Sequence, residues 1–358
     1  MTNYITTNSN NYSNYNDLME DRFMNNRVQE IKNSLTAFSQ DKYRKKDMKD
    51  EYIKLQRQVV GLVMGQEAAQ DNSISVRKVS EVIKEACAHN DKVDPKLMYK
   101  TLHHLKKLSN AIAGEIRGLH GETIVTAFID NIDCNKLMLK GIELESEGIR
   151  TEIDNLVITK RGAFIVEVKN VSGEVIIDED GSLRKKSAVD GTFVGEGNIY
   201  EKMVVKEALV KKAIKAALSK EVRVSHIVVF TDHSVQVTNN CEYINVRDLS
   251  ELQEIIMDTT VKKIYTEHDM EKIVDSVKSM ENYGYYAPNI EASKLKNNLA
   301  TLMVTLAQDQ IEEEDSKSFG MAEPVVVGNQ NKKVKMKYKI IMGVANWLMD
   351  MVPDDMAS

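Results

Sequence analysis

Asp154, Glu167 and Lys169 are charged residues inside two apolar runs of the sequence, 151–158 and 163–170. Runs of this length, rich in Ile and Val and separated by a turn that ends in glycine, predict a β-hairpin. Aliphatic strands do not readily hold unpaired carboxylates, because burying a charge without a partner is costly. A divalent cation would remove that cost, since Mg²⁺ takes oxygen ligands, usually one or two carboxylates with water and phosphate completing its shell.

The pairing of the two expected strands depends on the loop between them. With an even-numbered loop centred between Lys160 and Arg161, Asp154 lies directly opposite Glu167, and the two carboxylates share one face of the hairpin. A three-residue loop with a bulge at Gly162 would shift the pairing by one residue. That shift would send Asp154 to the other face, so the geometry of the site is conditional on the loop.

With Mg²⁺ in place, these residues have the chemistry to hydrolyse a phosphodiester. Asp154, Glu167 and the backbone carbonyl of Val168 could hold the ion, which polarises the phosphodiester and lowers the pKa of bound water. Lys169 would position or activate that water and offset charge in the transition state. The alternative is a cross-strand salt bridge from Lys169 to Asp154 or Glu152, in a hairpin with one wet face.

An α/β domain is expected around this hairpin. The pattern predicts a helix at 121–131, strands at 136–144, 151–159, 163–169 and 173–178, a helix at 199–219, a strand at 222–230, a short strand at 243–246 and a helix from 248. The nearly continuous apolar run Val222–Phe230 suits a strand buried on both faces of a sheet.

Helical segments are expected on both sides of that domain. Residues 1–17 are polar with almost no aliphatic residues, which predicts a disordered tail, and 18–114 carry apolar residues at helical spacing. Residues 261–358 are expected to form a linker and C-terminal helices. They include a basic segment, 331–339, and an apolar stretch, 340–352, that is too short to span a bilayer. The N-terminal helices are candidates for coiled-coil pairing into a homo-oligomer.

Composition limits what the whole chain could be. Of its 358 residues 42% are apolar and 28% charged, which excludes collagenous and wholly disordered proteins. The 48 Lys and Arg against 54 Asp and Glu give a net charge of −6, so any polyanion site must be local. Three cysteines without CxxC spacing argue against a disulfide framework or a zinc ribbon. With no signal peptide and no membrane-spanning run, a cytoplasmic protein without membrane insertion is expected.

The string Glu-Ile-Asp-Asn-Leu-Val-Ile-Thr-Lys-Arg-Gly-Ala-Phe-Ile-Val-Glu-Val-Lys-Asn, followed by Gly173, closely resembles the core of the NERD (nuclease-related) domain. The resemblance starts at Gly118-Leu119-His120-Gly121-Glu122 and ends near Phe230. It implies a NERD-like domain at 115–260 of the PD-(D/E)-x-K nuclease superfamily. The implied fold is a mixed β-sheet flanked by helices, with a restriction-endonuclease-like core. Members of that superfamily mostly cut DNA with Mg²⁺, for which Mn²⁺ could substitute.

Carried over residue by residue, the resemblance implies that Asp154 and Glu167 are metal ligands and that Lys169 is the catalytic lysine. Glu122 matches the first-helix glutamate of the family and is expected to assist catalysis. Its spacing independently places it on the apolar stripe of its helix, facing the sheet. The alternative for Glu122 is a first-turn glutamate that complements the helix dipole.

The sequence departs from the family at the opening of the helix near residue 199. The family often has Asn-Pro-x-x-Gln there, whereas this chain has Asn198-Ile199-Tyr200-Glu201-Lys202. Lys202 is expected to contact a substrate phosphate, with an ordinary surface lysine as the alternative, and Asn170 is a second expected substrate contact. The sequence thus predicts a Mg²⁺-dependent deoxyribonuclease; the alternative is a catalytically silent module on the same fold that binds nucleic acid or protein.

Overall fold

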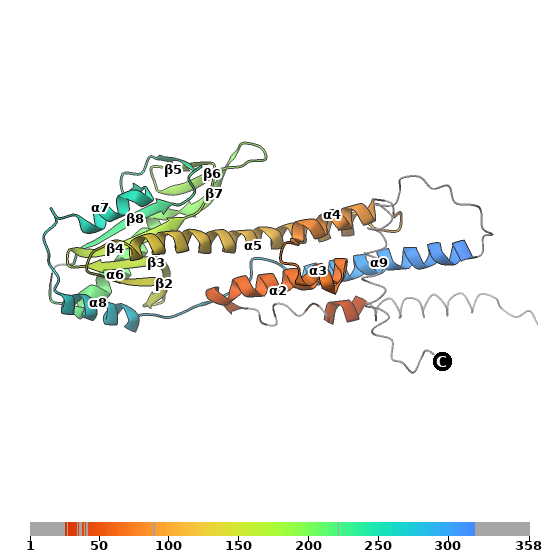
Figure 1. Cartoon of the computed structure of the whole chain (residues 1–358), viewed down its shortest axis with the longest axis horizontal. Coiled ribbons are helices and arrows are strands. Elements are labelled where there is room, and N and C mark those ends of the chain that lie inside the picture. The colour runs from red at the N-terminus through yellow and green to blue at the C-terminus, as the bar shows by residue number, and fades with distance from the viewer. Residues whose placement is uncertain are drawn as a thin grey trace, which may run out of the picture. The chain divides into compact units, whose positions relative to one another are not determined.

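The computed structural model describes residues 42–318 except 89 and 221, together with 26, 28–33, 35, 38 and 40, and side chains as far as 308. The expected disordered tail at 1–17 and the basic segment at 331–339 lie outside the described residues. The chain divides into a helical unit, formed by residues up to Ala113 and from Tyr286 onward, and an α/β unit, Gly114–Tyr285. The boundary falls inside helix α5 (Pro95–Asp130), which is unbroken (Figure 1).

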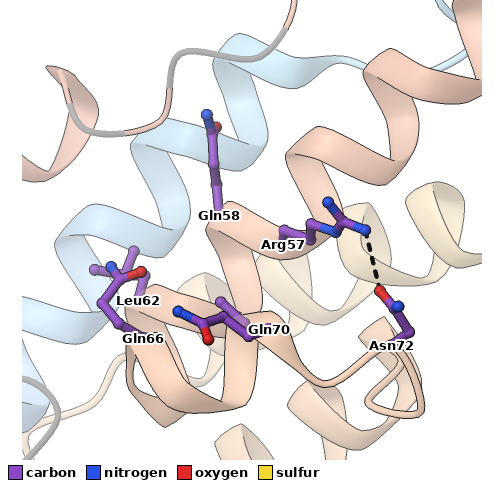
Figure 2. Close-up of a pocket in the computed structure, with 7 residues that line it drawn as sticks. Arg57, Gln58, Leu62, Gln66, Gln70 and Asn72 are labelled. Carbon is purple, nitrogen blue, oxygen red and sulfur yellow. Dashed lines mark hydrogen bonds between the residues drawn. The ribbon is translucent and has the colours of Figure 1, made fainter.

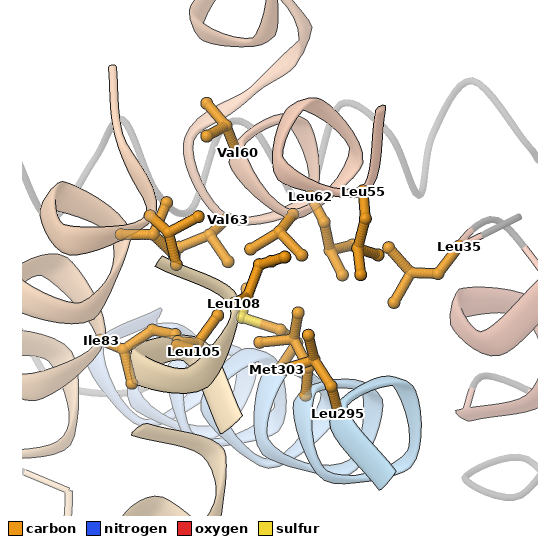
Figure 3. Packing of buried hydrophobic residues seen from close by; sticks show 14 of the residues in the cluster. Leu35, Leu55, Val60, Leu62, Val63, Ile83, Leu105, Leu108, Leu295 and Met303 are labelled. Atoms are coloured by element: carbon orange, nitrogen blue, oxygen red, sulfur yellow. The ribbon is translucent and has the colours of Figure 1, made fainter. Parts of the chain in front are cut away.

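The helical unit is built around one hydrophobic core. Its elements are β1 (Tyr43–Arg44), α2 (Lys45–Met64), α3 (Gln66–Gln70), α4 (Val76–Cys87), the first part of α5 and α9 (Ala292–Ser318). Leu55 of α2, Ile83 of α4 and Leu105 of α5 are almost completely buried, and Leu295 and Met303 of α9 join the same cluster (Figure 3). The expected helical N-terminal region is confirmed, apart from the two-residue strand β1, and its core includes a C-terminal helix, α9.

The α/β unit contains two sheets. The larger has the order β10-β8-β4-β3-β2, and the smaller has the order β7-β6-β5-β9. The strands of the larger sheet are β2 (Lys136–Ser146), β3 (Ile149–Thr159), β4 (Gly162–Lys169), β8 (Val224–Phe230) and β10 (Val246–Arg247). Strands β2, β3 and β4 pair antiparallel, whereas β8 pairs parallel with both β4 and β10. The sheet is therefore mixed, as expected.

Helices cover both faces of the larger sheet. The helices of this unit after α5 are α6 (Ile199–Ala217), the short 3-10 helix η1 (Leu249–Glu251), α7 (Leu252–Met257) and α8 (Glu267–Ser279). Ile158 and Ile165 belong to a core shared with α6 and α8, while Val157 and Val166 belong to a core shared with α5 and α7. Because side chains alternate along a strand, β3 and β4 are buried on both faces. The expected mixed sheet flanked by helices is confirmed.

Three features differ from the sequence-based expectation. The helix expected at 121–131 is the end of α5, which continues through the residues where a break was expected. The smaller sheet adds strands β6 (Ser182–Lys186), β7 (Phe193–Asn198) and β9 (Gln236–Asn239) to the expected β5 (Glu174–Ile177). The unit ends at Tyr285, in β11 (Tyr285–Tyr286), and not near 260, because α8 buries Met270, Ile273 and Val277 in the core beneath the sheet.

Among the described residues, no helix has both the length and the hydropathy needed to cross a membrane.

Candidate functional site

The hairpin of β3 and β4 has the register that an even-numbered loop produces. The ladder runs from the pair Thr159–Gly162 to the pair Asn155–Val166, which leaves Lys160 and Arg161 as a two-residue loop. The alternative with a three-residue loop is therefore wrong. Past the last pair, the next residues on the two strands are Asp154 and Glu167, so both carboxylates lie where the two strands part.

Beyond the last backbone pair of β3 and β4, the Asp154 side chain forms the hydrogen bond to β4. The backbone N–H of Val168 donates a hydrogen bond to Asp154 Oδ2 at 2.7 Å. The neighbouring carbonyl, of Lys169, points the other way and accepts from the Thr231 N–H at 3.0 Å. Because the N–H and C=O of one residue point to the same side of an extended strand, the Val168 carbonyl lies on the Asp154 side. This is the direction that its expected role as a metal ligand requires.

Glu167 is buried and carries two ammonium partners. Lys169 Nζ lies 2.5 Å from Glu167 Oε1, and the Lys206 ammonium, from helix α6, pairs with Glu167 Oε2. The Lys206 side chain is 5% exposed and that of Lys169 is 22% exposed. A charge buried this deeply is stable only with a close partner, so Glu167 and Lys206 depend on each other.

The surroundings drive the pKa values of the two carboxyls in opposite directions. Burial, and then the neighbouring negative charge of Glu167, raise the pKa of Asp154 from 3.8 to about 6. Burial would also raise the pKa of Glu167, but the charges of Lys206 and Lys169 outweigh it and lower that pKa to about 2. Adjacent carboxyls whose pKa values are pushed apart are typical of catalytic sites.

Residues 117–231 match the family model of the nuclease-related domain, NERD. The matched segment is about a third of the chain and contains Asp154, Glu167, Lys169 and Lys206, so the resemblance seen in the motif is confirmed. The chain matches no curated protein and no solved structure. The match supports a nuclease-related function for the NERD domain.

The oxygen atoms at the parting of β3 and β4 fit a hard divalent cation. Asp154, Glu167 and the Val168 carbonyl offer only oxygen donors, and the raised pKa of Asp154 reflects a negative charge that a cation would offset. Both Glu167 oxygens are engaged by ammonium groups, so a cation there would displace one of them. Lys169 is the more exposed of the two and is the one with room to move away.

Lys206 was missed in the sequence, although its position carried a signal. It lies three residues after Met203 and three before Leu209, and both of these are buried on α6. A lysine on the apolar stripe of a helix faces the interior of the domain. Its buried charge then needs a close partner such as a carboxylate. The spacing alone does not single out Lys206, because the exposed Lys202 also lies three residues from an apolar residue on each side, Ile199 and Val205.

The lysine expected to contact substrate, Lys202, lies one turn earlier on α6 and is exposed. The Asn198 that opens the expected motif is the N-cap of α6, because its side-chain oxygen accepts from the Glu201 N–H at 2.9 Å. Thus α6 brings Lys206 to Glu167, while Lys202 stays at the surface.

Asn170 directly follows β4, and Glu122 lies on α5. Gly121 lets the helix approach closely, since a Cβ there would meet Asn170 Cβ at 2.7 Å. Asn170 Nδ2 donates to the Arg117 carbonyl at 2.8 Å, so this amide ties α5 to the strand. Glu122 is half-buried on the same helix, which covers the Val166 face of the sheet and not the Glu167 face. Within the described part of the chain, no three acidic, His or Cys side chains are grouped to hold a metal.

Proposed function

We propose that the NERD domain is a Mg²⁺-dependent nuclease that hydrolyses phosphodiester bonds of DNA. The observation that carries this proposal is the meeting of Asp154, Glu167 and Lys169 where β3 and β4 part, with the two carboxyl pKa values driven apart. The match of residues 117–231 to the nuclease-related family supports it. The choice of DNA and of Mg²⁺ follows the family resemblance of the motif.

Asp154, Glu167 and the Val168 carbonyl would hold the ion. Bound Mg²⁺ would polarise a phosphate oxygen and lower the pKa of a water molecule. The Val168 N–H fixes the Asp154 carboxylate in place before any ligand arrives. Lys206 keeps Glu167 ionised and immobile from inside the domain. These contacts prepare the carboxylates, so little reorganisation is needed during the reaction.

Lys169 would act on the substrate. Its side chain shares the Glu167 face of β4 and reaches partly into solvent. Once displaced from Glu167, its ammonium would donate to a phosphate oxygen or to the attacking water and offset the negative charge that builds up in the transition state. Lys206 is enclosed and would not reach the substrate, so the two lysines would have separate roles.

Cleavage of supercoiled plasmid DNA tests this function. The purified chain would be incubated with Mg²⁺, Mn²⁺ or EDTA, next to Asp154→Ala and Lys169→Ala variants. Lys215→Ala serves as a matched control, since it removes an exposed lysine from the last turn of the same helix, α6. We expect metal-dependent nicking that both site variants lose and the control retains. Cleavage that survives in Lys169→Ala would disprove the assigned site.

One observation favours a second function, a catalytically silent module that binds nucleic acid or protein. Both oxygens of Glu167 are held by lysines, and lysines in these positions can replace a cation permanently. This module would show no cleavage with any metal and no thermal stabilisation by Mg²⁺. It would still bind DNA or a protein partner, seen as a shift of the complex in a native gel. Metal-dependent cleavage that disappears in the site variants would exclude it.

A further inference from the structure

An open pocket of about 520 Å³ lies between helices α4 and α5 of the helical unit. Arg77 and Lys84 line it from α4, and Tyr99, His103 and Lys106 line it from α5. Residues three, four and seven positions apart share one face of a helix, so each helix presents a row of these side chains to the pocket. None of these residues belongs to the NERD domain, and the pocket is separate from the site around Glu167.

The pocket is positively charged, although the whole chain carries −6. None of its lining residues is acidic. Lys84 and Lys106 are exposed and form no ion pair with any described residue, and Arg77 has only a loose contact with Glu81, at 3.7 Å. Three cations that share one pocket repel each other, and an anion with several charges would relieve that repulsion.

An exposed aromatic ring stands among these cations. Tyr99 is 70% exposed, the most exposed tyrosine in the described part of the chain. Its ring lies close to that of His103, with a centroid distance of 6.4 Å and an angle of 18° between the planes. The nearly parallel His103 ring lies beside Tyr99 without covering its face, and Leu102 adds a partly buried apolar side chain to the pocket. An exposed aromatic ring is a surface on which another flat ring can stack.

A neighbouring pocket of the same unit lacks these properties. It is lined mainly by the amides of Gln58, Gln66 and Gln70, and its one cation, Arg57, donates to Asn72 Oδ1 at 3.0 Å (Figure 2). Two lysines that pair with no described residue, Lys84 and Lys106, therefore distinguish the pocket between α4 and α5 from this second opening.

We infer that the pocket between α4 and α5 binds an unpaired strand of nucleic acid. Arg77, Lys84 and Lys106 contact its phosphates, and one base stacks on Tyr99. Proteins that bind single strands combine these two features, a basic groove and an aromatic platform. A duplex does not fit as well, because its bases are already stacked on each other. This inference does not rest on the proposed nuclease activity, since it concerns a different unit and a binding step without cleavage.

Fluorescence anisotropy of a labelled oligothymidylate, with the full chain in EDTA, measures this binding while preventing metal-dependent cleavage. We expect Lys84→Ala/Lys106→Ala to weaken binding and to flatten the slope of log K against log salt by about 1.4, because each lysine that neutralises a phosphate of a single strand adds about 0.7 to that slope. Lys42→Ala/Lys46→Ala is the matched control, because it removes two exposed lysines of the same unit outside the pocket. The control is expected to change the salt dependence by much less.

The stacking part is tested at Tyr99. Removal of one base–aromatic stack weakens binding by about five-fold to about a hundred-fold, so Tyr99→Ala should fall in that range and Tyr99→Trp should bind at least as well as the wild type. The inference is overturned if the pocket lysine variant behaves like the control. It is also overturned if Tyr99→Ala binds like the wild type, a result that would leave an unspecific polyanion site suited to phosphorylated peptides. Either failure would leave the plasmid cleavage test unaffected.

Discussion

Replacing Asp154 by Asn should stabilise the metal-free protein at neutral pH. The Asp154 carboxylate is enclosed beside Glu167, and its raised pKa means that the folded state disfavours its charged form. Asn has nearly the same shape, and its Oδ1 can still accept the hydrogen bond from the Val168 N–H. The substitution thus removes the charge and keeps the contact.

The size of the effect follows from the pKa. A rise from 3.8 to about 6 corresponds to ~3 kcal/mol, at ~1.4 kcal/mol per pH unit. Between about pH 4 and pH 6 the folded chain retains a proton that the unfolded chain has released, so the stability of the wild type falls as the pH rises through this window. Above pH 6 this decrease is complete. The lowered pKa of Glu167 affects the stability of wild type and variant alike, so its contribution to the difference between them cancels to first order.

Urea unfolding in EDTA at pH 4, 5, 6 and 7 would measure this difference. Hydrogen exchange of peptides from β3 and β4 would follow the α/β unit separately from the helical unit. We expect Asp154→Asn to gain stability relative to the wild type as the pH rises, with the gain level above about pH 6. Asp178→Asn is the control and should lose stability relative to the wild type as the pH rises. The reason is that the hydrogen bond from Arg184 lowers the pKa of Asp178, so the folded state favours its charged form.

Two results would refute this reasoning. One is a stability difference between Asp154→Asn and wild type that stays constant from pH 4 to pH 7. The other is a wild type that is more stable than the variant at pH 7 in EDTA. Either would mean that Asp154 is not destabilised by burial beside Glu167 and that its carboxylate is not held ready for a cation.

Two further substitutions test the packing around the site. Lys206→Met leaves Glu167 with Lys169 alone and should lower the free energy of unfolding, measured by urea titration, by about 3 kcal/mol. Lys202→Met, on the exposed face of α6, should change it by less than about 0.5 kcal/mol. Equal effects of the two substitutions would contradict the buried pair of Lys206 and Glu167. Gly121→Ala should destabilise the protein by about 1–3 kcal/mol, because the added Cβ would lie 2.7 Å from Asn170 Cβ. At Gly118 an added Cβ has no neighbour within 4 Å, so Gly118→Ala should stabilise the helix by up to about 1 kcal/mol. Thermal unfolding would separate these two, and a neutral Gly121→Ala would disprove the close approach of α5.

The hairpin could be predicted from the sequence because all of its information is local. Two apolar runs, a two-residue loop and the alternation of side chains along a strand are enough to place Asp154 next to Glu167. Strands β2, β3 and β4 follow from the same local patterns, because short connections join them. The mixed sheet was implied by the family resemblance, since its parallel pairing joins β4 to the distant strand β8. Only the loop length was undecided, and the structure resolves it.

The second lysine and the smaller sheet were missed because they depend on contacts distant in the sequence. Lys206 is 37 residues after Lys169, and nothing near it indicates the carboxylate that it meets. Strand β9 pairs with β5 through a parallel ladder, so its partner lies far away in the chain. Strands β6 and β7 are short and largely polar, which weakens the hydrophobic alternation that reveals a strand.

The charge balance of the site predicts that metal and DNA bind cooperatively. At pH 7 the carboxylates of Asp154 and Glu167 are matched by the ammonium groups of Lys169 and Lys206, so the site is close to neutral without a ligand. Mg²⁺ alone would leave an excess of positive charge, and a DNA phosphate would offset it. Because coupling between two ligands is reciprocal, each should raise the affinity of the other. Calorimetric titration of Mg²⁺ with and without a phosphorothioate DNA that resists cleavage would measure this coupling. Lys169→Met removes one positive charge, so it should tighten Mg²⁺ binding in the absence of DNA; weaker binding in that variant would show that the lysine does not compete with the cation for Glu167.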